Sequence, residues 1–207
     1  MNSRTMTGRF LILGPLGVMV TWMVWGGVLG FPEASDAAAT IAAISENADM
    51  TKTLMAIVGG FMFIMVAGLQ GLRNTMNEGP GSNYAAIGVL IVTMSAAVSL
   101  GEIAMSLGVA DAGSAGAVEL ATTLYYVGNA IGVVTSAGMF LGFATIALAV
   151  YLQKNHNQII SGLLFITAVF GLIVALVDYN NMLMIVGYMG MTVSVILIGV
   201  STLRSSE

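Results

Sequence analysis

Residues 159–203 read IISGLLFITAVFGLIVALVDYNNMLMIVGYMGMTVSVILIGVSTL. They contain two continuous apolar runs, Ile159–Asp178 and Met182–Leu203, with a short gap between them. Each run holds about 20 residues, and at ~1.5 Å per residue a helix of that length crosses a hydrocarbon core of ~30 Å. Strands of a membrane barrel would instead alternate between apolar and polar positions. The segment therefore predicts two transmembrane helices.

Apolar runs of similar length recur through the rest of the chain. They are Phe10–Gly30, Leu54–Leu72, Ala85–Val109 and Asn129–Tyr151. Hydrophobic residues make up 57% of the 207 residues and charged residues only 8%, too few polar groups to cover a water-soluble surface. Inside a bilayer each backbone polar group needs a partner within the structure, which favours helices. We predict an all-α integral membrane protein with six transmembrane helices in one bundle, forming a single domain within the lipid bilayer.

Most positive charges fall in one set of alternate gaps between these runs. The cations in that set are Arg4, Arg9, Arg73, Lys154 and Arg204. Lys52 is the only cation in the other set, which holds most of the acidic residues. Loops rich in Lys and Arg stay in the cytoplasm, so we predict a bacterial-type plasma membrane protein with both termini cytoplasmic.

The first run follows two arginines, so a cleaved secretory signal is an alternative to a first span. Its cleavage zone would be the small residues between Ala34 and Ala39. The apolar region of a signal peptide is ~7–15 residues long, whereas this run continues for about 20. The length favours an uncleaved first span, and cleavage would leave five spans.

The outer segment Phe31–Thr53 has the pattern of a short helix rather than of a loop. Ser35 or Asp36 can cap its start, and Glu46 and Asn47 end the apolar repeat. The repeat consists of Ala37, Ile41 and Ile44, spaced to share one face of a helix. We predict a short external helix on the outer membrane surface between the first two spans, with a water-exposed cap as the alternative.

A second outer segment, Asp111–Gly128, precedes the fourth run. A single helix from Ala115 to Tyr151 would be too long for the bilayer. We therefore expect a break or a protruding outer turn near Gly128.

The third run carries a polar stripe. Its members are Gly88, Ser95, Ser99, Glu102 and Ser106, at spacings that place them on one side of a helix. Glu102 would lie about 10 Å inside the outer boundary of the hydrocarbon, too deep to reach water easily. A carboxylate at that depth is costly unless it is protonated or finds partners, and an ionisable group inside a membrane is a functional hypothesis by default.

The partners of Glu102 could come from its own helix and from the outer ends of the others. The candidate polar pocket consists of Glu102, Ser95, Ser99, Ser106, Asn129, Asp178 and Lys52, with Asn180 and Asn181 at similar depth. Such a pocket could bind a proton, a cation or a small polar solute. The alternative is a buried acid that is held neutral or paired to fix helix packing.

Small residues form stripes on the fourth and sixth runs. The candidate helix-packing glycines are Gly128, Gly132, Gly138, Gly142, Gly187 and Gly190. Small residues allow two helix backbones to approach closely in a membrane. The sequence favours contacts within one chain, with a homo-oligomer or a larger membrane complex as the alternative.

Several classes of function find no support in the sequence. The chain has no Cys, no His within an apolar run and no catalytic or phosphate-binding motif, so we expect no enzyme, no cofactor and no metal site. The sixteen Met residues allow a copper(I) interpretation, but apolar packing is their commoner role. The net charge of −4 and the lack of a basic cluster argue against nucleic acid.

The stretch ASDAAATIAAISENADMTKTLMAIVGGFMFIMVAGLQGLR, residues 34–73, and the loop LQKNHNQ, residues 152–158, carry a resemblance in layout. The chain resembles small six-span bacterial membrane proteins that are grouped as a domain of unknown function. The shared layout is an Ala-rich external segment, a Gly-rich second span and a short fourth loop, over most of the chain. The resemblance implies six spans and supplies no site residues.

Two classes of function remain. The preferred one is a non-catalytic structural or accessory membrane component. The alternative is a transporter or channel for a small solute, a cation or a proton, in which Glu102 lines the pathway.

Overall fold

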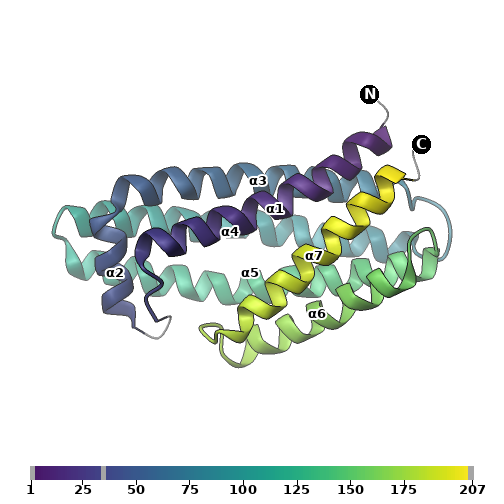
Figure 1. Ribbon diagram of the computed structural model, residues 1–207. Helices are drawn as coiled ribbons and strands as arrows, with labels where there is room; N and C mark the ends of the chain where they lie inside the picture. Colours follow the sequence, from purple (N-terminus) through teal and green to yellow (C-terminus); the bar gives the residue numbers. More distant parts are fainter. Residues whose placement is uncertain (1–2, 34–35, 205–207) are drawn as a thin grey trace.

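The computed structural model describes residues 3–33 and 36–204, and the described chain is helical apart from its connecting loops (Figure 1). Its helices are α1 (Ser3–Leu29), α2 (Ala37–Glu46), α3 (Ala48–Asn74), α4 (Ser82–Ser114), α5 (Val118–Gln153), α6 (Gln158–Val177) and α7 (Leu183–Arg204). All except α2 are long and apolar enough to cross a membrane. The prediction of six spans with a short helix between the first two is confirmed.

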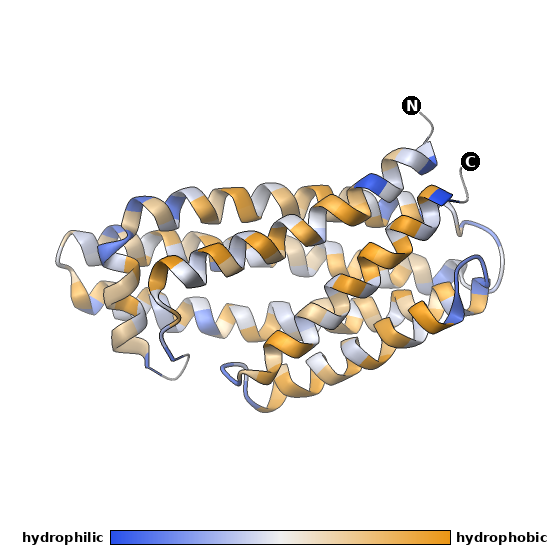
Figure 2. Cartoon of the chain, in the orientation of Figure 1, coloured by the Kyte–Doolittle hydropathy of each residue, from blue (hydrophilic) through white to orange (hydrophobic). Residues whose placement is uncertain are grey.

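Hydrophobic residues cover the long helices, and hydrophilic residues gather near the two ends of the bundle (Figure 2). Most helices extend past the predicted apolar runs, since a helix need not stop where it leaves the hydrocarbon. We call the end that carries α2 the α2 end. The opposite end, where α1 begins and α7 finishes, is the terminal end (Figure 1).

The expected break near Gly128 is wrong, because α5 continues without interruption from Val118 to Gln153. Its 36 residues give a length of about 54 Å, well beyond a ~30 Å hydrocarbon core. Gly128 is buried against Met105 of α4, so the missing Cβ serves packing rather than a bend. The neighbouring α4 has 33 residues, and the hairpin of α4 and α5 therefore projects beyond the bilayer.

The turn at the tip of this hairpin needs a glycine. Gly116 has φ +77°, in the left-handed region that residues with a Cβ rarely adopt. The N–H of Ala117 donates to the carbonyl of Ala112 at 2.8 Å, and that of Gly116 donates to Gly113 at 3.0 Å. These bonds satisfy carbonyls that the end of α4 would otherwise leave unpaired.

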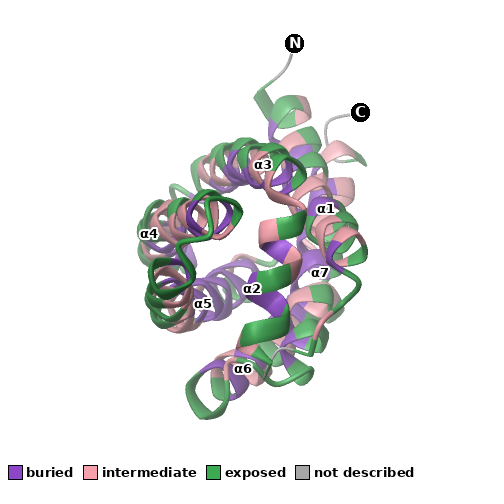
Figure 3. Cartoon of the chain, turned by 90° about the vertical axis from the view of Figure 1, so that its left-hand side faces the viewer, coloured by how far each residue is buried: buried purple, intermediate pink, exposed green. Residues whose placement is uncertain are grey.

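The six long helices form a closed ring. Each contacts the next in the order α1, α3, α4, α5, α6 and α7, and α7 returns to α1. Viewed along the bundle, the ring surrounds a central region and α2 lies across it (Figure 3). The fold therefore places a short helix over one end of the space between the spans.

The short helix α2 is fixed at its start and along one side. Asp36 caps it by accepting the N–H of Ala39 at 2.9 Å, whereas Ser35, the other predicted cap, lies outside the described residues. Ile41 and Ile44 are buried in a small cluster with Val109 and other residues of α4 and α5. These isoleucines, two of the three residues in the predicted apolar repeat, therefore pack against the projecting hairpin.

Each candidate packing glycine faces another part of the same chain. A Cβ at Gly128, Gly138 or Gly142 would meet α4, and one at Gly187 or Gly190 would meet α6. A Cβ at Gly132 would meet Tyr179 of the turn between α6 and α7, and then Glu102 of α4. Gly138, for example, lies against Ser95. The small stripes thus bring helices of one chain together.

The loops at the terminal end are joined by side-chain hydrogen bonds. The side chain of Gln153 donates to the carbonyl of Glu78 at 2.6 Å and accepts the N–H of Gly81 at 3.2 Å. His156 Nδ1 lies 3.0 Å from Ser201 Oγ on α7. Burial lowers the pKa of His156 below its ordinary value, because the folded protein solvates the charged ring poorly.

This shift predicts a pH dependence of stability. Below about pH 6.5 the unfolded chain protonates His156 more readily than the folded chain does. The contribution of His156 is therefore neutral above that pH, and it lowers stability as the pH falls towards the folded-state pKa. Thermal unfolding of the parent and of His156→Gln in detergent between pH 5 and 8 should show a steeper acid loss in the parent. Equal slopes for the two proteins would contradict this expectation.

Candidate functional site

A cavity of about 610 Å³ lies inside the helix ring, towards the α2 end. It is lined by α1, α3, α4, α5 and α7, by Thr40 and Ile44 of α2, and by the turn before α7. Both tryptophans of the chain, Trp22 and Trp25, are in its wall. Most of the sixteen methionines line it too: Met19, Met23, Met62, Met65, Met105, Met139, Met182, Met184, Met189 and Met191.

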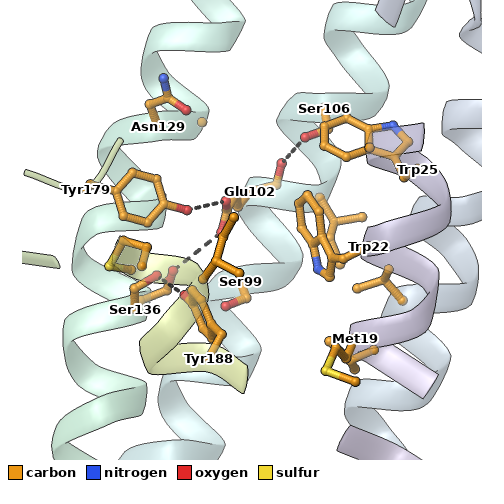
Figure 4. Close-up of a pocket in the computed structure, with 18 of the residues that line it drawn as sticks. Met19, Trp22, Trp25, Ser99, Glu102, Ser106, Asn129, Ser136, Tyr179 and Tyr188 are labelled. Atoms are coloured by element: carbon orange, nitrogen blue, oxygen red, sulfur yellow. Dashed lines mark hydrogen bonds between the residues drawn. The ribbon is translucent and has the colours of Figure 1, made fainter. Parts of the chain in front are cut away.

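The polar part of this cavity is centred on Glu102 (Figure 4). Among the described residues that line it, Glu102 is the only one with a side chain that carries a charge at neutral pH. The hydroxyl of Tyr179 donates to Glu102 Oε1 at 3.1 Å. Thr135 Oγ1 lies 3.5 Å from the other carboxyl oxygen, Oε2. Ser106 contacts only the backbone of Glu102, because its hydroxyl donates to the carbonyl at 3.2 Å.

Oε2 of Glu102 is only weakly bound, because its one neighbouring donor, the hydroxyl of Thr135, also contacts a second acceptor. The hydroxyl of Thr135 has one proton, and its shorter bond, 3.1 Å, goes to the backbone carbonyl of Gly132. Oε2 can then do one of two things: carry a proton and donate it to Thr135, or accept a hydrogen from a bound molecule. One carboxyl oxygen is held by Tyr179, and the other is available for exchange.

Tyr179 reaches Glu102 because of the turn between α6 and α7. Asp178 accepts the N–H of Asn180 at 3.2 Å, and Asn181 accepts the N–H of Leu183 at 3.0 Å. These side-chain-to-backbone bonds fix a tight turn, from which Tyr179 points into the ring (Figure 4). Burial, together with the charge of Glu102, raises the pKa of Tyr179 well above its ordinary value. The phenol therefore keeps its proton and remains a donor.

A second tyrosine lies on α7, close to the first. Tyr188 shares a hydrogen bond of 2.5 Å with Ser136 of α5, and its ring contacts Phe140 with the centroids 4.8 Å apart. On the opposite side of the cavity, Trp25 donates through its indole N–H to Thr51 at 3.1 Å, and Trp22 packs edge-on against Trp25. Several fixed aromatic rings thus surround the space beside Glu102 (Figure 4).

The residues of the candidate polar pocket are only partly brought together. Ser99, Ser106 and Asn129 line the cavity with Glu102. Ser95 does not, because it is buried in the contact between α4 and α5.

Two charged members of the candidate pocket lie elsewhere. Lys52 forms an ion pair with Asp111 near the α2 end. Asp178 is exposed and holds Asn180 and Asn181 in the turn. The placement of Lys52 and Asp178 beside Glu102 is therefore corrected, and no protein cation from the described cavity wall neutralises the carboxyl group.

Sequence reasoning missed the direct partners of Glu102. Thr135 lies among the small residues of the fourth run, where its sequence position indicates helix packing rather than a polar contact. Tyr179 lies in the gap between two spans, where polar residues are expected and do not indicate a binding site. The available signal was the sequence Asp178-Tyr179-Asn180-Asn181, whose Asp and Asn residues favour a side-chain-stabilised turn that can aim the tyrosine inward.

The arrangement suits a molecule with an apolar body and one polar group. Small-molecule sites are typically concave, mostly apolar and of ≈300–1,000 Å³, with a few polar groups that set orientation. Methionine side chains adapt to irregular shapes. Among residues 3–33 and 36–204, no group of three or more His, Cys, Asp or Glu residues is placed to hold a metal ion.

No protein-family model, curated protein or solved structure matches this chain. The resemblance to the six-span group of unknown function therefore stays a prediction.

Proposed function

We propose that the protein is a small-solute carrier whose substrate site is the cavity at Glu102. The observation that supports this function best is the cavity itself, a largely apolar space of about 610 Å³ whose wall carries one carboxyl group. The apolar part of a solute would lie among the methionines and aromatic rings, and its polar group would bind Glu102.

A purely structural membrane component is less well supported by this arrangement. The cavity is not enclosed, since residues of its wall such as Met23 and Met182 are exposed. Packing alone does not require an apolar recess beside an intramembrane carboxyl group, which is costly and marks a functional site by default. A bound solute would contact both the apolar wall and Glu102.

The orientation of the chain in the membrane is also a proposal. Arg4, Arg9, Arg73, Lys154 and Arg204 lie near the start of α1, in the last turns of α3 and α7, and just after α5. Loops and ends rich in Lys and Arg stay in the cytoplasm, so the terminal end would face the cytosol and the α2 end the outside. The cavity would then lie in the outer half of the bilayer.

A fluorescent probe and a cavity-filling variant test the binding function. The probe is 1-aminoanthracene, a small neutral arylamine whose emission rises in apolar protein cavities. We expect saturable emission from protein in detergent micelles above that of empty micelles. Ser99→Phe places a ring in the cavity wall and should abolish the saturable part, because Ser99 lines the cavity and is buried.

The matched control is Ser114→Phe, the same change at an exposed position near the tip of α4. It should bind the probe as the parent does, and circular dichroism should show unchanged helicity in both variants. The function is contradicted if the parent shows no saturable signal or if both variants retain it.

A further inference from the structure

We infer that the solute held at Glu102 is an organic cation, whose ammonium group lies at the carboxylate and exchanges with a proton there. This inference rests on the proposed function and names the chemical class of its substrate. It depends on three observations: the charges in the cavity, the weakly bound carboxyl oxygen Oε2 and the aromatic rings around it.

The charge balance of the cavity favours a positive ligand. Glu102 is the one formal charge among the described lining residues, and Lys52, the nearest candidate counter-ion from the sequence, is paired with Asp111. An ionised carboxylate inside a membrane needs a compensating charge, and a bound cation supplies it. An anionic solute would meet repulsion from Glu102 and no Lys, Arg or His in the described wall.

The geometry of the carboxyl group leaves room for either a proton or a cation. Tyr179 donates to Oε1, and the hydroxyl of Thr135 lies 3.5 Å from Oε2 but closer, at 3.1 Å, to the carbonyl of Gly132. Oε2 is therefore the atom that binds either a proton or the cation. The cation contacts Oε2 through an N–H group or, in a quaternary ammonium, through its positively polarised methyl groups. Binding releases the proton to solvent, so the total charge at Glu102 stays balanced.

The aromatic side chains suit the ammonium group of such a ligand. Trp22 lines the cavity across from Glu102, and Tyr179 and Tyr188 lie beside the carboxyl group (Figure 4). The face of an aromatic ring attracts a cation, most strongly in Trp, and this attraction grows where water is excluded. The methionines contribute polarisable contacts for alkyl groups.

Competition with a proton makes cation binding depend on pH. The titratable groups that line the cavity with Glu102 are Tyr179 from the turn, Tyr188 from α7 and Tyr125 from α5. The cavity surfaces of α1, α3 and α5 add uncharged side chains, among them Trp22, Met62 and Asn129. The exchange is therefore assigned to Glu102, and cation affinity should fall on acidification by at most about tenfold per pH unit, the limit for one competing proton.

Two probes that differ only in charge test the inference. Benzyltrimethylammonium is cationic, and neopentylbenzene is its neutral carbon isostere. Each competes with 1-aminoanthracene for the parent protein in micelles at pH 8 and at pH 6. At pH 8 we expect the cation to displace the dye at a concentration at least about tenfold lower than its isostere. The advantage should shrink at pH 6.

The matched variants Glu102→Gln and Glu119→Gln each remove one negative charge. Their comparison distinguishes the effect of the carboxyl group in the cavity from the effect of the protein's overall charge. Glu119 is exposed in the first turn of α5, so Glu119→Gln should keep the full preference for the cation. Glu102→Gln should lose both the preference for the cation over the neutral isostere and the pH dependence of that preference. Comparing variants cancels the unequal partition of the two probes into micelles.

A second variant covers the case in which Glu102→Gln does not fold. Trp22→Leu leaves the carboxyl group in place, and it should weaken cation binding several-fold more than it weakens the binding of neopentylbenzene, because only the cation loses the attraction of the ring face. An equal preference for the two probes in the parent overturns the cation assignment but leaves the binding function standing, as does a preference that survives Glu102→Gln. If neither probe displaces the dye and Ser99→Phe has no effect on it, the binding function fails as well.

Discussion

Gly142→Ala is expected to destabilise the protein by about 1–3 kcal/mol, the usual cost of inserting a methyl group into a packed core. Gly142 lies in the contact between α5 and α4. A Cβ there would press against the backbone of Gly88 and the side chain of Val92. The backbone cannot move aside without separating the two helices, so the expected effect on stability is large.

Gly162 is the matched control for this change. It lies within α6, and a Cβ at that position would meet nothing within 4 Å. Gly162→Ala should leave stability unchanged or raise it by up to about 1 kcal/mol, because Ala has the higher helix propensity. Denaturant unfolding of both variants, followed by circular dichroism in one detergent, makes the comparison. Equal effects at the two positions would show that α4 and α5 do not pack as described.

A single cysteine at each end of the bundle is expected to give opposite, all-or-none labelling results. The chain has no natural Cys, so an introduced one is the only target. Ser114→Cys would place a thiol near the projecting tip of α4, and Asn155→Cys would place one in the exposed loop after α5. A membrane-impermeant maleimide added to intact bacterial cells should label Ser114→Cys fully, and Asn155→Cys only after permeabilisation.

The reverse labelling pattern would overturn the proposed orientation, because the terminal end would then face outward. Labelling of both positions in intact cells would contradict the helix arrangement itself, in which they lie at opposite ends of long spans. The cysteine-free parent protein supplies the background, and Ser114→Cys together with Asn155→Cys in one chain provides an internal comparison.

The spans and the short helix could be predicted because their causes are local. Six apolar runs of membrane-crossing length are visible in the sequence, and Asp36 precedes an Ala-rich repeat as helix caps do. The continuity of α5 could not be predicted in the same way. The thickness of the bilayer predicts where a helix leaves the hydrocarbon. Beyond that point, Ile41 and Ile44 pack on the α4–α5 hairpin and stabilise the part of α5 that lies outside the membrane.

Glu102 and its neighbours on the same helix could be predicted from the sequence, but its partners from other parts of the chain could not. The spacing of Ser99, Glu102 and Ser106 follows from helix geometry alone, and all three side chains reach the cavity wall. The partners Tyr179 and Thr135 depend on which helices become neighbours, and that order is set by packing across the whole ring. For the same reason depth alone misplaced Lys52, which pairs with Asp111 and does not line the cavity.

Because α4 is one unbroken helix, a change in its tilt at Glu102 would also move its outer end. Glu102 lies in the cavity wall, and the tip at Ser114 stands on the same rigid rod about 18 Å further along. A tilt of about 5° at the level of the acid would move that tip by about 1.6 Å, and α2, docked on the rod, would travel with it. A tilt of α4 on binding at Glu102 would therefore displace α2 at the aqueous surface.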